Sequence, residues 1–510
     1  MSGSIVPTIA LCGRLDHHGF DVDRLLGLLA RRGVGHLAID DLCRDPRAFH
    51  ELGERDDETR VVAAVCPDGP SHDEIRARAR RAGLDPGTGA IRVDLSRAAS
   101  YGPPEDVESR ALAILLAAAA SRAETSRSPA DGLRLGLPTS EVSRRSFFSL
   151  ARASYVPVAV VGQGGCRGSA VCGLCVEACP VDAIEPGGRV PRVDKARCIG
   201  CAACVTACPV DDAVRLPGDD LAGFEVGLRT LVEERTDAGV LVSCRSAPPT
   251  PDARVPGTWL PIEVPCLSIV TPGWALEVLR AGAPAVAFRG CGDRCGAGAP
   301  ARLTPRIGFV RSALDAIGVT DPGDRVRLVL PPDEDAADPT SRPEDLGSLP
   351  IASPDLAISL REPAASATLL TRARAQGKVA EALGSPLGIV TVRAEGCTLC
   401  GLCAQACPTG AFGFDEGPLS ASLDLVPERC VGCGHCVTIC PEKVIDLEPG
   451  VDLGRLGGHE TIKRAAIARC TRCGEPIANA AMLERIRAML PDDPAVTSTI
   501  GELCMNCRGY

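Results

Sequence analysis

Cysteines at short, regular intervals dominate two segments in the C-terminal half of the chain. Segments 397–408 and 430–441 each follow the pattern Cys-x2-Cys-x2-Cys-x3-Cys-Pro. Spacers of this length let one loop wrap an iron–sulfur cluster, and in paired motifs the fourth cysteine of each motif crosses to the other cluster. The proline turns the chain out of the loop because it fixes φ and has no N–H. The spacing predicts two [4Fe–4S] clusters, one held by Cys397, Cys400, Cys403 and Cys440 and the other by Cys430, Cys433, Cys436 and Cys407.

An earlier pair of motifs departs from this pattern at one position. Its second motif is complete, but in its first motif Ser169 stands where the first cysteine is expected, and Cys166 precedes it. A small insertion in the binding loop would make Cys166 the displaced ligand, and a labile or three-iron cluster is the alternative. The predicted ligand sets are Cys166, Cys172, Cys175 and Cys208 for one [4Fe–4S] cluster, and Cys198, Cys201, Cys204 and Cys179 for the other.

Both pairs of motifs resemble the dicluster ferredoxins of bacteria. The resemblance implies two ferredoxin-like α+β domains, at 136–218 and 389–448, that carry four [4Fe–4S] clusters and transfer electrons. A zinc site or scattered structural thiols are the alternative, but neither would require two complete runs that each end in proline.

Four more cysteines fall at or just after predicted strands in residues 219–332. The predicted strands are 239–242, 260–264, 285–288 and 325–330, and the predicted helices are 221–235, 272–281 and 301–317. This alternation is typical of a parallel sheet, in which the carboxyl ends of the strands meet at one edge. We therefore expect convergence of the four thiols of Cys244, Cys266, Cys291 and Cys295. They suit a [2Fe–2S] cluster, and structural or redox-active thiols are the alternative.

The same region resembles the iron–sulfur delta subunit of methyl-viologen-reducing hydrogenase. The resemblance is carried by Val264-Pro-Cys-Leu-Ser268, Leu279-Arg-Ala-Gly-Ala283 and Val286-Ala-Phe-Arg-Gly-Cys-Gly-Asp-Arg-Cys295. That family usually has one residue more between its last two cysteines than this chain has. The resemblance implies a [2Fe–2S] cluster in a subunit that passes electrons between a hydrogenase and a heterodisulfide reductase.

The N-terminal residues 1–135 predict a further α/β domain with a parallel sheet. Three cysteines end or follow its predicted strands: Cys12, Cys43 and Cys66. The order strand–Cys–Gly, Asp-Leu-Cys, Val-Cys-Pro and Gly-Leu-Asp-Pro (83–86) is similar to the N-terminal region of the A-type subunit of heterodisulfide reductase. That family has a fourth cysteine near the position of Ala99, and its flavin-binding domain does not follow here. A cluster held by the three cysteines and a structural role for them are both open.

The C-terminal residues 449–510 contain two Cys-x2-Cys pairs with a predicted helix at 479–490 between them. Glycine follows the first pair, which is typical of a zinc ribbon, and four thiolates in tetrahedral geometry form a closed structural site. The predicted zinc ligands are Cys470, Cys473, Cys504 and Cys507. Rubredoxin-type iron and another cluster are the alternatives. Residues 333–388 predict a solvated linker, rich in Pro, Asp and Ser, followed by a helix.

The composition sets limits on the function. The 510-residue chain has a net charge of −10, whereas a nucleic acid or an anionic membrane would require a basic face. Its 27 cysteines cluster as Cys-x2-Cys repeats, which indicates metal binding rather than disulfides and favours the reducing cytoplasm. The longest apolar run, Ala111–Ala120, is about half a membrane span, so we expect a buried helix and no membrane span.

These features predict a multidomain α/β plus α+β protein with two parallel-sheet domains, two ferredoxin-like domains and a zinc ribbon. The sequence contains no catalytic side-chain constellation. The leading hypothesis is an iron–sulfur electron-transfer subunit that connects a hydrogenase or formate dehydrogenase with a heterodisulfide-reductase-like or flavin-containing partner. The alternatives are an oxidoreductase with a substrate-binding cluster at the three N-terminal cysteines, and a redox-sensing scaffold.

Overall fold

The computed structural model describes most of the chain between Thr8 and Arg508. The described residues are 8–45, 47–50, 61–67, 69–70, 72–82, 90–95, 98, 104–120, 133–135, 153–155, 158–162, 166, 168–169, 172–210, 213–216, 221–247, 258–292, 295–330, 342–349, 360, 384–490 and 500–508.

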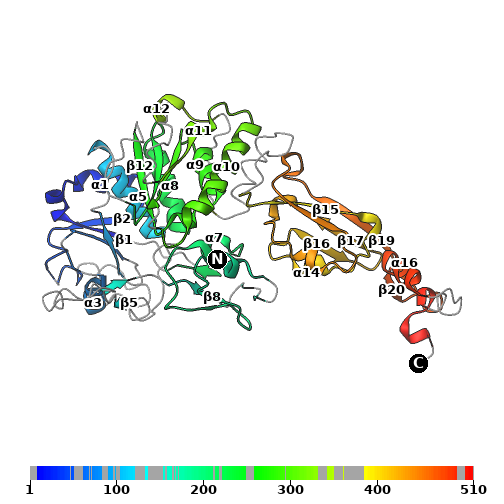
Figure 1. Ribbon diagram of the computed structural model, residues 1–510. Helices are drawn as coiled ribbons and strands as arrows, with labels where there is room; N and C mark the ends of the chain where they lie inside the picture. The colour runs from blue at the N-terminus through cyan, green and yellow to red at the C-terminus, as the bar shows by residue number, and fades with distance from the viewer. Residues whose placement is uncertain are drawn as a thin grey trace, which may run out of the picture.

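The N-terminal domain is built on a four-stranded parallel sheet with the strand order β2-β1-β3-β4 (Figure 1). Its strands are β1 (Thr8–Cys12), β2 (Gly35–Ile39), β3 (Val61–Val65) and β4 (Ala90–Asp94), and its helices are α1 (Val22–Arg31), α3 (His72–Arg81) and α5 (Val107–Ala120). Strand β3 is buried along its whole length, as expected for a parallel sheet covered on both faces. The apolar run in α5 forms a buried helix as predicted, whereas β4 is a strand that the sequence analysis missed.

The second α/β domain repeats this strand order in its own parallel sheet, β12-β11-β13-β14. Its elements are α8 (Leu221–Glu234), β11 (Gly239–Cys244), β12 (Trp259–Val264), α9 (Pro272–Ala281), β13 (Val286–Arg289), α10 (Ala299–Ala316), α11 (Pro322–Arg325) and β14 (Val326–Val329). In both sheets the first strand in the sequence lies between the second and the third. Open α/β sheets build their sites outside the carboxyl ends of the strands, at the point where the strand order reverses.

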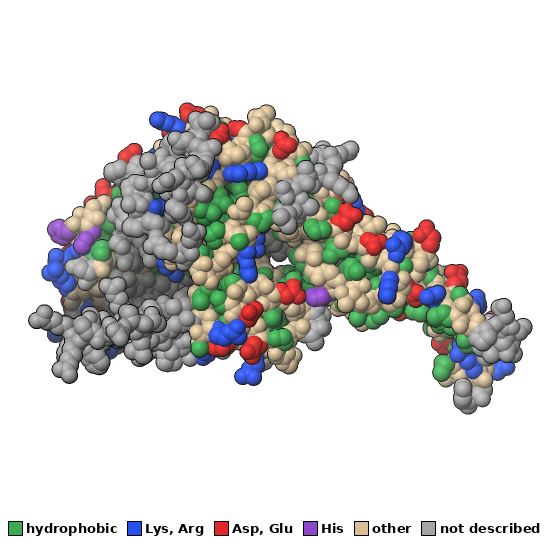
Figure 2. Space-filling view, in the orientation of Figure 1, with side chains coloured by type: hydrophobic (Ala, Val, Ile, Leu, Met, Phe, Trp, Pro, Cys, Tyr) green, Lys and Arg blue, Asp and Glu red, His purple; other side chains and the backbone are tan. Residues whose placement is uncertain are grey.

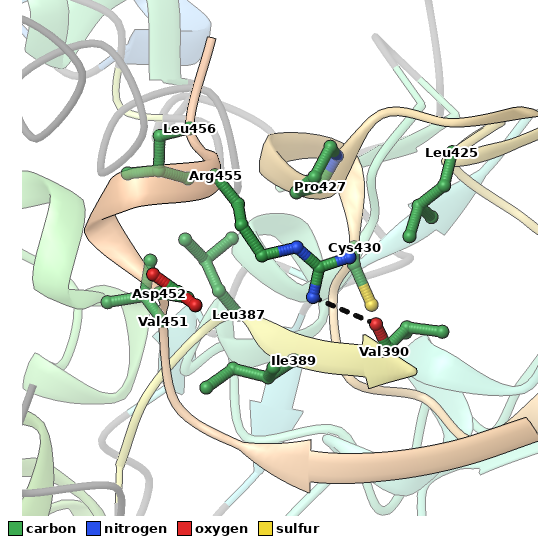
Figure 3. Close-up of a pocket in the computed structure, with 11 residues that line it drawn as sticks. Leu387, Ile389, Val390, Leu425, Pro427, Cys430, Val451, Asp452, Arg455 and Leu456 are labelled. Carbon is green, nitrogen blue, oxygen red and sulfur yellow. Dashed lines mark hydrogen bonds between the residues drawn. The ribbon is translucent and has the colours of Figure 1, made fainter. Parts of the chain in front are cut away.

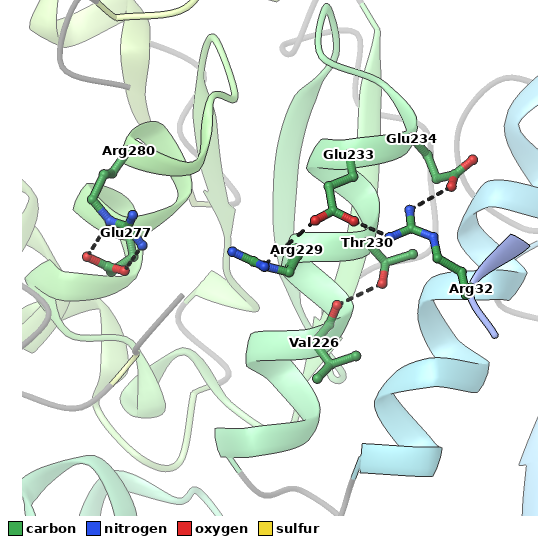
Figure 4. A network of polar contacts seen from close by, with 8 residues as sticks. All are labelled: Arg32, Val226, Arg229, Thr230, Glu233, Glu234, Glu277 and Arg280. Atoms are coloured by element: carbon green, nitrogen blue, oxygen red, sulfur yellow. Dashed lines mark hydrogen bonds and ion pairs between the residues drawn. The ribbon is translucent and has the colours of Figure 1, made fainter. Parts of the chain in front are cut away.

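The two α/β domains are joined by α5, which packs along α8. A Cβ at Gly227 of α8 would lie 3.3 Å from the Cβ of Ala117 in α5, so the missing side chain permits close approach of the helices. Arg32 adds polar contacts to this interface, because it pairs with Glu233 and donates to Glu234 at 2.8 Å (Figure 4). The same view shows the buried ion pair that Arg280 and Glu277 form within α9.

The first ferredoxin unit (158–216) lies against the second α/β domain. Its first and last strands, β7 (Val160–Val161) and β10 (Val214–Arg215), pair with each other, and between them lie α6 (Leu174–Glu177), β8 (Ile184–Glu185), β9 (Arg192–Val193) and α7 (Ala203–Ala207). Helix α7 packs on the short helix η5 (Leu267–Ile269) of the α/β domain, and the buried residues of both parts form one continuous core. The start of this domain that we predicted, residue 136, lies outside the described residues.

The second ferredoxin unit (384–450) has the same plan. Strand β15 (Gly388–Val392) pairs with β18 (Ile445–Pro449), and between them lie α14 (Leu402–Ala406), β16 (Phe412–Glu416), β17 (Ser420–Leu425) and α15 (His435–Ile439). Its Leu387 and the adjoining Val451 and Leu453 join the core of the second α/β domain. At its start, a Cβ at Gly384 would lie 2.4 Å from the carbonyl oxygen of Pro305, so only glycine fits against α10 there.

The C-terminal segment extends the sheet of the second ferredoxin unit instead of forming a separate core. Strand β19 (Glu460–Arg469) pairs with β17 on one side and with β20 (Pro476–Asn479) on the other, which gives the order β16-β17-β19-β20. Helix α16 (Ala480–Met489) follows, and its Ala481 lies in the core of the ferredoxin unit. The expected domain boundary at residue 448 therefore lies inside one packed unit. The reason is that β19 pairs with the free edge of the β16–β17 hairpin.

The expected solvated linker differs in its described part. Residues 342–349 include α12 (Pro343–Leu346), and Pro343, Leu349 and Leu360 are buried, the last two in the core of the second α/β domain. These buried side chains fix the described part of the segment to the second α/β domain. The expected helix at 365–383 lies outside the described residues.

Acidic and basic side chains are interspersed over the face seen in Figure 2, and neither sign forms a continuous field there. None of the described helices is both long enough and apolar enough to span a membrane.

Candidate iron–sulfur and metal sites

The second ferredoxin unit brings four thiols together around one cavity. Cys397, Cys400 and Cys403 from the first motif line it together with Cys440 from the second motif, and we name these four residues set 1. Burial raises the pKa of Cys403 to about 12, and the thiols of Cys397 and Cys400 add to this effect. Because buried thiolates so close together repel one another, this group requires a cation such as cluster iron to be stable in its ionised form.

The remaining four thiols of this unit form set 2, which consists of Cys407, Cys430, Cys433 and Cys436. Burial raises the pKa of Cys436 to about 12, and Cys430, Cys433 and Cys407 contribute. Figure 3 shows Cys430 in a pocket beside the guanidinium of Arg455. That guanidinium is fixed by a hydrogen bond of 2.9 Å to the carbonyl oxygen of Val390 and by an ion pair with Glu460.

Cys166 lies with the other thiols of its predicted ligand set in the first ferredoxin unit. This group, Cys166, Cys172, Cys175 and Cys208, is set 3. Burial raises the pKa of Cys175 to about 12, and the thiols of Cys208, Cys172 and Cys166 contribute. Ser169 has a different role, because its hydroxyl donates to the carbonyl oxygen of Gly187 at 2.8 Å and accepts from the N–H of Gly187. The serine therefore ties the loop to the β8–β9 hairpin.

Set 4 consists of Cys179, Cys198, Cys201 and Cys204 and lies deepest in the first ferredoxin unit. Burial raises the pKa of Cys204, and the Cys201 and Cys198 thiols are the next largest causes. Both Cys198 and Cys204 are buried in the core that this unit shares with the second α/β domain.

Backbone N–H groups point at several of these sulfurs. Ala183 donates to Cys179 at 3.2 Å, and Ala411 makes the equivalent 3.2 Å contact to Cys407 in the second unit. Such N–H···S bonds help set the potential of a bound cluster. To wrap the sulfurs, the loops place even non-glycine residues in the left-handed region, with φ of 60° at Ala202 and 54° at Leu399. The loop geometry and the all-thiol donor sets therefore fit [4Fe–4S] clusters.

A fifth group of thiols converges at the carboxyl edge of the second α/β sheet. Set 5 consists of Cys244, Cys266, Cys291 and Cys295. The Cys266 thiol donates a hydrogen bond that lowers the pKa of Cys244, and burial together with the neighbouring Cys295 raises the pKa of Cys291. At the start of α10, the N–H of Ala299 donates to the Cys295 sulfur at 3.3 Å. The four thiols lie close enough to change one another's pKa, and a [2Fe–2S] cluster at set 5 stays a prediction.

The C-terminal thiol set is more compact. The sulfurs of Cys470, Cys473, Cys504 and Cys507 all lie within 4.8 Å of one another. Four thiolates around one tetrahedral zinc at about 2.3 Å would be about 3.8 Å apart, so the spacing fits a single ion. Backbone N–H groups, first that of Cys504, lower the pKa of Cys470 to about 6, which favours the thiolate that a metal needs.

Three thiols also gather in the N-terminal domain. The sulfurs of Cys12, Cys43 and Cys66, here the N-terminal thiol trio, lie within 4.8 Å of one another, and all three residues are buried. The Cys66 and Cys12 sulfurs are 3.7 Å apart, and the N–H of Cys66 donates to the Cys43 sulfur at 3.0 Å. A hydrogen bond from the Cys43 thiol lowers the pKa of Cys12 to about 6. A cavity lined by Cys43 and Cys66 opens beside the trio.

Comparison with known protein families identifies two segments. Residues 166–211 and residues 396–445 each match a family described as a 4Fe-4S dicluster domain. The chain carries two dicluster [4Fe–4S] domains. These domains support an iron–sulfur electron-transfer role, and each matched segment contains the two motifs of one ferredoxin unit. A search of curated proteins gives no match, so the comparisons do not support the specific resemblance to the delta subunit of the hydrogenase or to the A-type subunit of heterodisulfide reductase.

The structure places the cysteines of each predicted ligand set near one another, and which ions or clusters they hold stays a prediction. The clustering of basic side chains around the N-terminal thiol trio could not be predicted, because Arg14, Arg44 and Arg78 reach the cavity from three separate segments. The sequence also did not predict which thiols of different domains affect one another's pKa. One signal for the basic side chains was present in the sequence, because Arg14 and Arg44 follow Cys12 and Cys43 closely.

Proposed function

We propose that this protein is an intramolecular electron relay in which sets 1 to 4 each hold a [4Fe–4S] cluster and set 5 holds a [2Fe–2S] cluster. When bound, such clusters accept and pass on electrons. The observation that carries the proposal is that each thiol set lies beside the next, across three domains.

Within each ferredoxin unit the two sets are neighbours. Burial raises the pKa of Cys403 to about 12, and Cys436 of set 2 is among the thiols that add to the effect. In the first unit burial raises the pKa of Cys204, and Cys175 of set 3 contributes. Helices α14 and α15 pack on each other, as do α6 and α7, so the two halves of each unit hold their sets at a fixed separation.

The sets are also neighbours between domains. Burial raises the pKa of Cys433 of set 2, and Cys172 of set 3, in the other ferredoxin unit, is one of the contributing thiols. Burial likewise raises the pKa of Cys201 of set 4 to about 11, with Cys266 of set 5 as the largest contributing thiol. The packing of α7 on η5, which directly follows Cys266, provides the physical link. The order of the relay is therefore set 1, set 2, set 3, set 4 and set 5.

The ends of the relay are the places for partners. Set 5 lies at a sheet edge in the region that resembles the hydrogenase delta subunit, which supports docking of a hydrogenase, formate dehydrogenase or heterodisulfide-reductase-like protein there. Set 1 lies at the other end, in the unit whose sheet continues into the C-terminal segment, and we propose that the C-terminal thiol set holds a structural zinc ion. The side chain of Asn479 donates to the carbonyl oxygen of Leu399 at 3.3 Å and so connects that segment to the set 1 loop.

Metal analysis of anaerobically purified full-length protein, with EPR spectra of the reduced state, tests the proposal. Four [4Fe–4S] clusters and one [2Fe–2S] cluster give about 18 iron atoms per chain, with matching sulfide, about one zinc ion and a [2Fe–2S] signal. About 16 iron atoms would contradict the [2Fe–2S] cluster at set 5, and about 14 or fewer would contradict four [4Fe–4S] clusters, with set 3 as the first candidate for the loss. Clusters that do not reoxidise with any protein or dye acceptor would contradict the relay itself.

A further inference from the structure

The two α/β domains place cysteines at corresponding points of the same sheet plan. Cys12 is the last residue of β1 and pairs with Ile39, the last residue of β2. In the second domain Cys244 is the last residue of β11 and pairs with Val264, the last residue of β12. In each domain a second cysteine follows the second strand and a third follows the third strand. Both thiol groups therefore lie at the carboxyl edge where the strand order reverses.

The two edges differ in what stands beside the three thiols. Set 5 has a fourth thiol, Cys295, whereas in the described part of the N-terminal domain the trio has none. A cavity of about 320 Å³ lies there instead. Gly69 contributes to the space beside the trio, because a Cβ at this position would lie 3.4 Å from the Cys43 sulfur and 2.8 Å from the carbonyl oxygen of Cys66. A volume of this size is typical of small-molecule sites.

Three arginines are among the described residues that line the cavity. Arg14, Arg44 and Arg78 line it together with His18, and Glu74 is the acidic residue among the described lining residues. Arg14 pairs with Asp41 at 3.6 Å, but both side chains are solvent-accessible, so this pair is weak. The Arg44 side chain has no ion-pair partner in the part of the chain that the structure describes. Among the described lining residues, the arginines therefore outnumber the acidic side chains.

Arg78 is the most buried of the three arginines that line the cavity. The residue is 6% exposed; its Nη1 donates to the carbonyl oxygen of Cys43 at 3.1 Å and its Nη2 to Glu74 at 2.6 Å. Its Nε is buried and has no hydrogen-bond partner among the described residues. Because a guanidinium cannot lose its proton, Arg78 keeps a permanent positive charge at the wall of the cavity.

We propose that this cavity binds a small organic anion, whose charged group is held by Arg14, Arg44 and Arg78 and whose other end reaches the N-terminal thiol trio. The fork of a guanidinium group matches a carboxylate, which makes a carboxylate the best fit for the charged end. The anion occupies the place that the fourth thiol has in set 5. This site is independent of the electron relay, because none of the relay thiols lines it.

Two alkylating agents of similar shape and different charge test the site. Iodoacetate and iodoacetamide both react when a thiolate sulfur attacks the CH2 carbon, an S–C bond forms and iodide leaves. Full-length, anaerobically purified protein is treated with each reagent, and the rates at the three thiols are followed by peptide mass spectrometry. We expect the iodoacetate-to-iodoacetamide rate ratio at the modified thiol of the trio to exceed that of free glutathione by about tenfold, because a cationic cavity concentrates the anionic reagent.

Substitution of the lining arginines gives the decisive comparison. Arg44→Gln and Arg14→Gln should each lower the iodoacetate rate more than the iodoacetamide rate, and so lower the rate ratio towards that of glutathione. Arg31→Gln is the matched control, because it removes the same charge from an exposed position of α1 outside the cavity lining. The proposal is overturned if the ratio equals that of glutathione, if the control lowers the ratio as much as Arg44→Gln, or if neither reagent modifies the trio. Iron content and EPR spectra, which test the relay, are separate readouts.

Discussion

At the scale of single residues, charge near the sulfurs decides how easily a cluster takes up an electron. The Nζ of Lys463 donates to the carbonyl oxygen of Cys397 at 2.7 Å. Burial raises the pKa of Cys397, and the positive charge of Lys463 acts in the opposite direction. The same attraction favours the more negative, reduced form of a cluster bound at set 1.

The variant Lys463→Met is expected to lower the reduction potential at set 1, because the charge that stabilises the reduced state is removed while the apolar stem is kept. An EPR-monitored redox titration would show the shift in one cluster. Arg464→Met, at the exposed neighbouring position of β19, is the control and should leave the potential unchanged. A similar shift in both variants would contradict the local effect of Lys463.

The displaced cysteine of set 3 gives a second prediction at this scale. Cys166→Ser should disrupt one cluster and lower the iron content by up to about four atoms per chain. The double variant Cys166→Ser with Ser169→Cys should not restore it, because the side chain at position 169 faces the backbone of Gly187 and the substitution also removes the two hydrogen bonds that fix this loop. Iron analysis checks both results, and full recovery in the double variant would show that the loop can adopt the regular spacing.

At the scale of elements, the α5–α8 interface includes a buried carboxylate. Asp106 precedes α5 and is 4% exposed, and its partner is the Nη1 of Arg235 at 2.6 Å, just after α8. The other carboxylate oxygen of Asp106 has no hydrogen-bond partner among the described residues. This ion pair is therefore a point at which the two α/β domains depend on each other.

Arg235→Met should lower the free energy of unfolding of the two packed α/β domains by about 2 kcal/mol, because it leaves the Asp106 carboxylate buried and unpaired. Asp237→Asn, which changes the exposed partner of the same arginine, should have an effect below about 1 kcal/mol. Chemical denaturation of the two variants makes the comparison. Equal losses in both would show that the interface does not depend on Asp106.

At the scale of the whole molecule, the order of the thiol sets predicts which centres sense each other. Cys204→Ser removes a thiol of set 4 and should slow the spin relaxation of a [2Fe–2S] signal from set 5, because the adjacent paramagnetic centre is lost. Cys400→Ser removes a thiol of set 1, at the distant end, and should leave that relaxation unchanged. Power saturation of the EPR signal measures both, and an identical response to the two variants would contradict the order.

The sequence predicted local features well, because hydrophobic periodicity and motif spacing are local properties. The predicted segments 239–242, 260–264 and 272–281 match β11, β12 and α9 within about two residues, the usual uncertainty of element ends. The electrostatic effect of Cys172 on Cys433 could not be predicted, because it depends on how two units pack that are more than two hundred residues apart. The addition of β19 to the ferredoxin sheet is non-local for the same reason.

The pairing of β19 with β17 has a consequence for dissecting the chain. A fragment that stops after β18 would expose the backbone donors and acceptors of β17 as a free sheet edge, with Leu423 and Leu425 of that strand losing part of their cover. Free edges of this kind recruit other chains by strand addition, so the shortened protein would self-associate. Strand β19 therefore also protects the protein from aggregation, whatever ion the C-terminal cysteines hold.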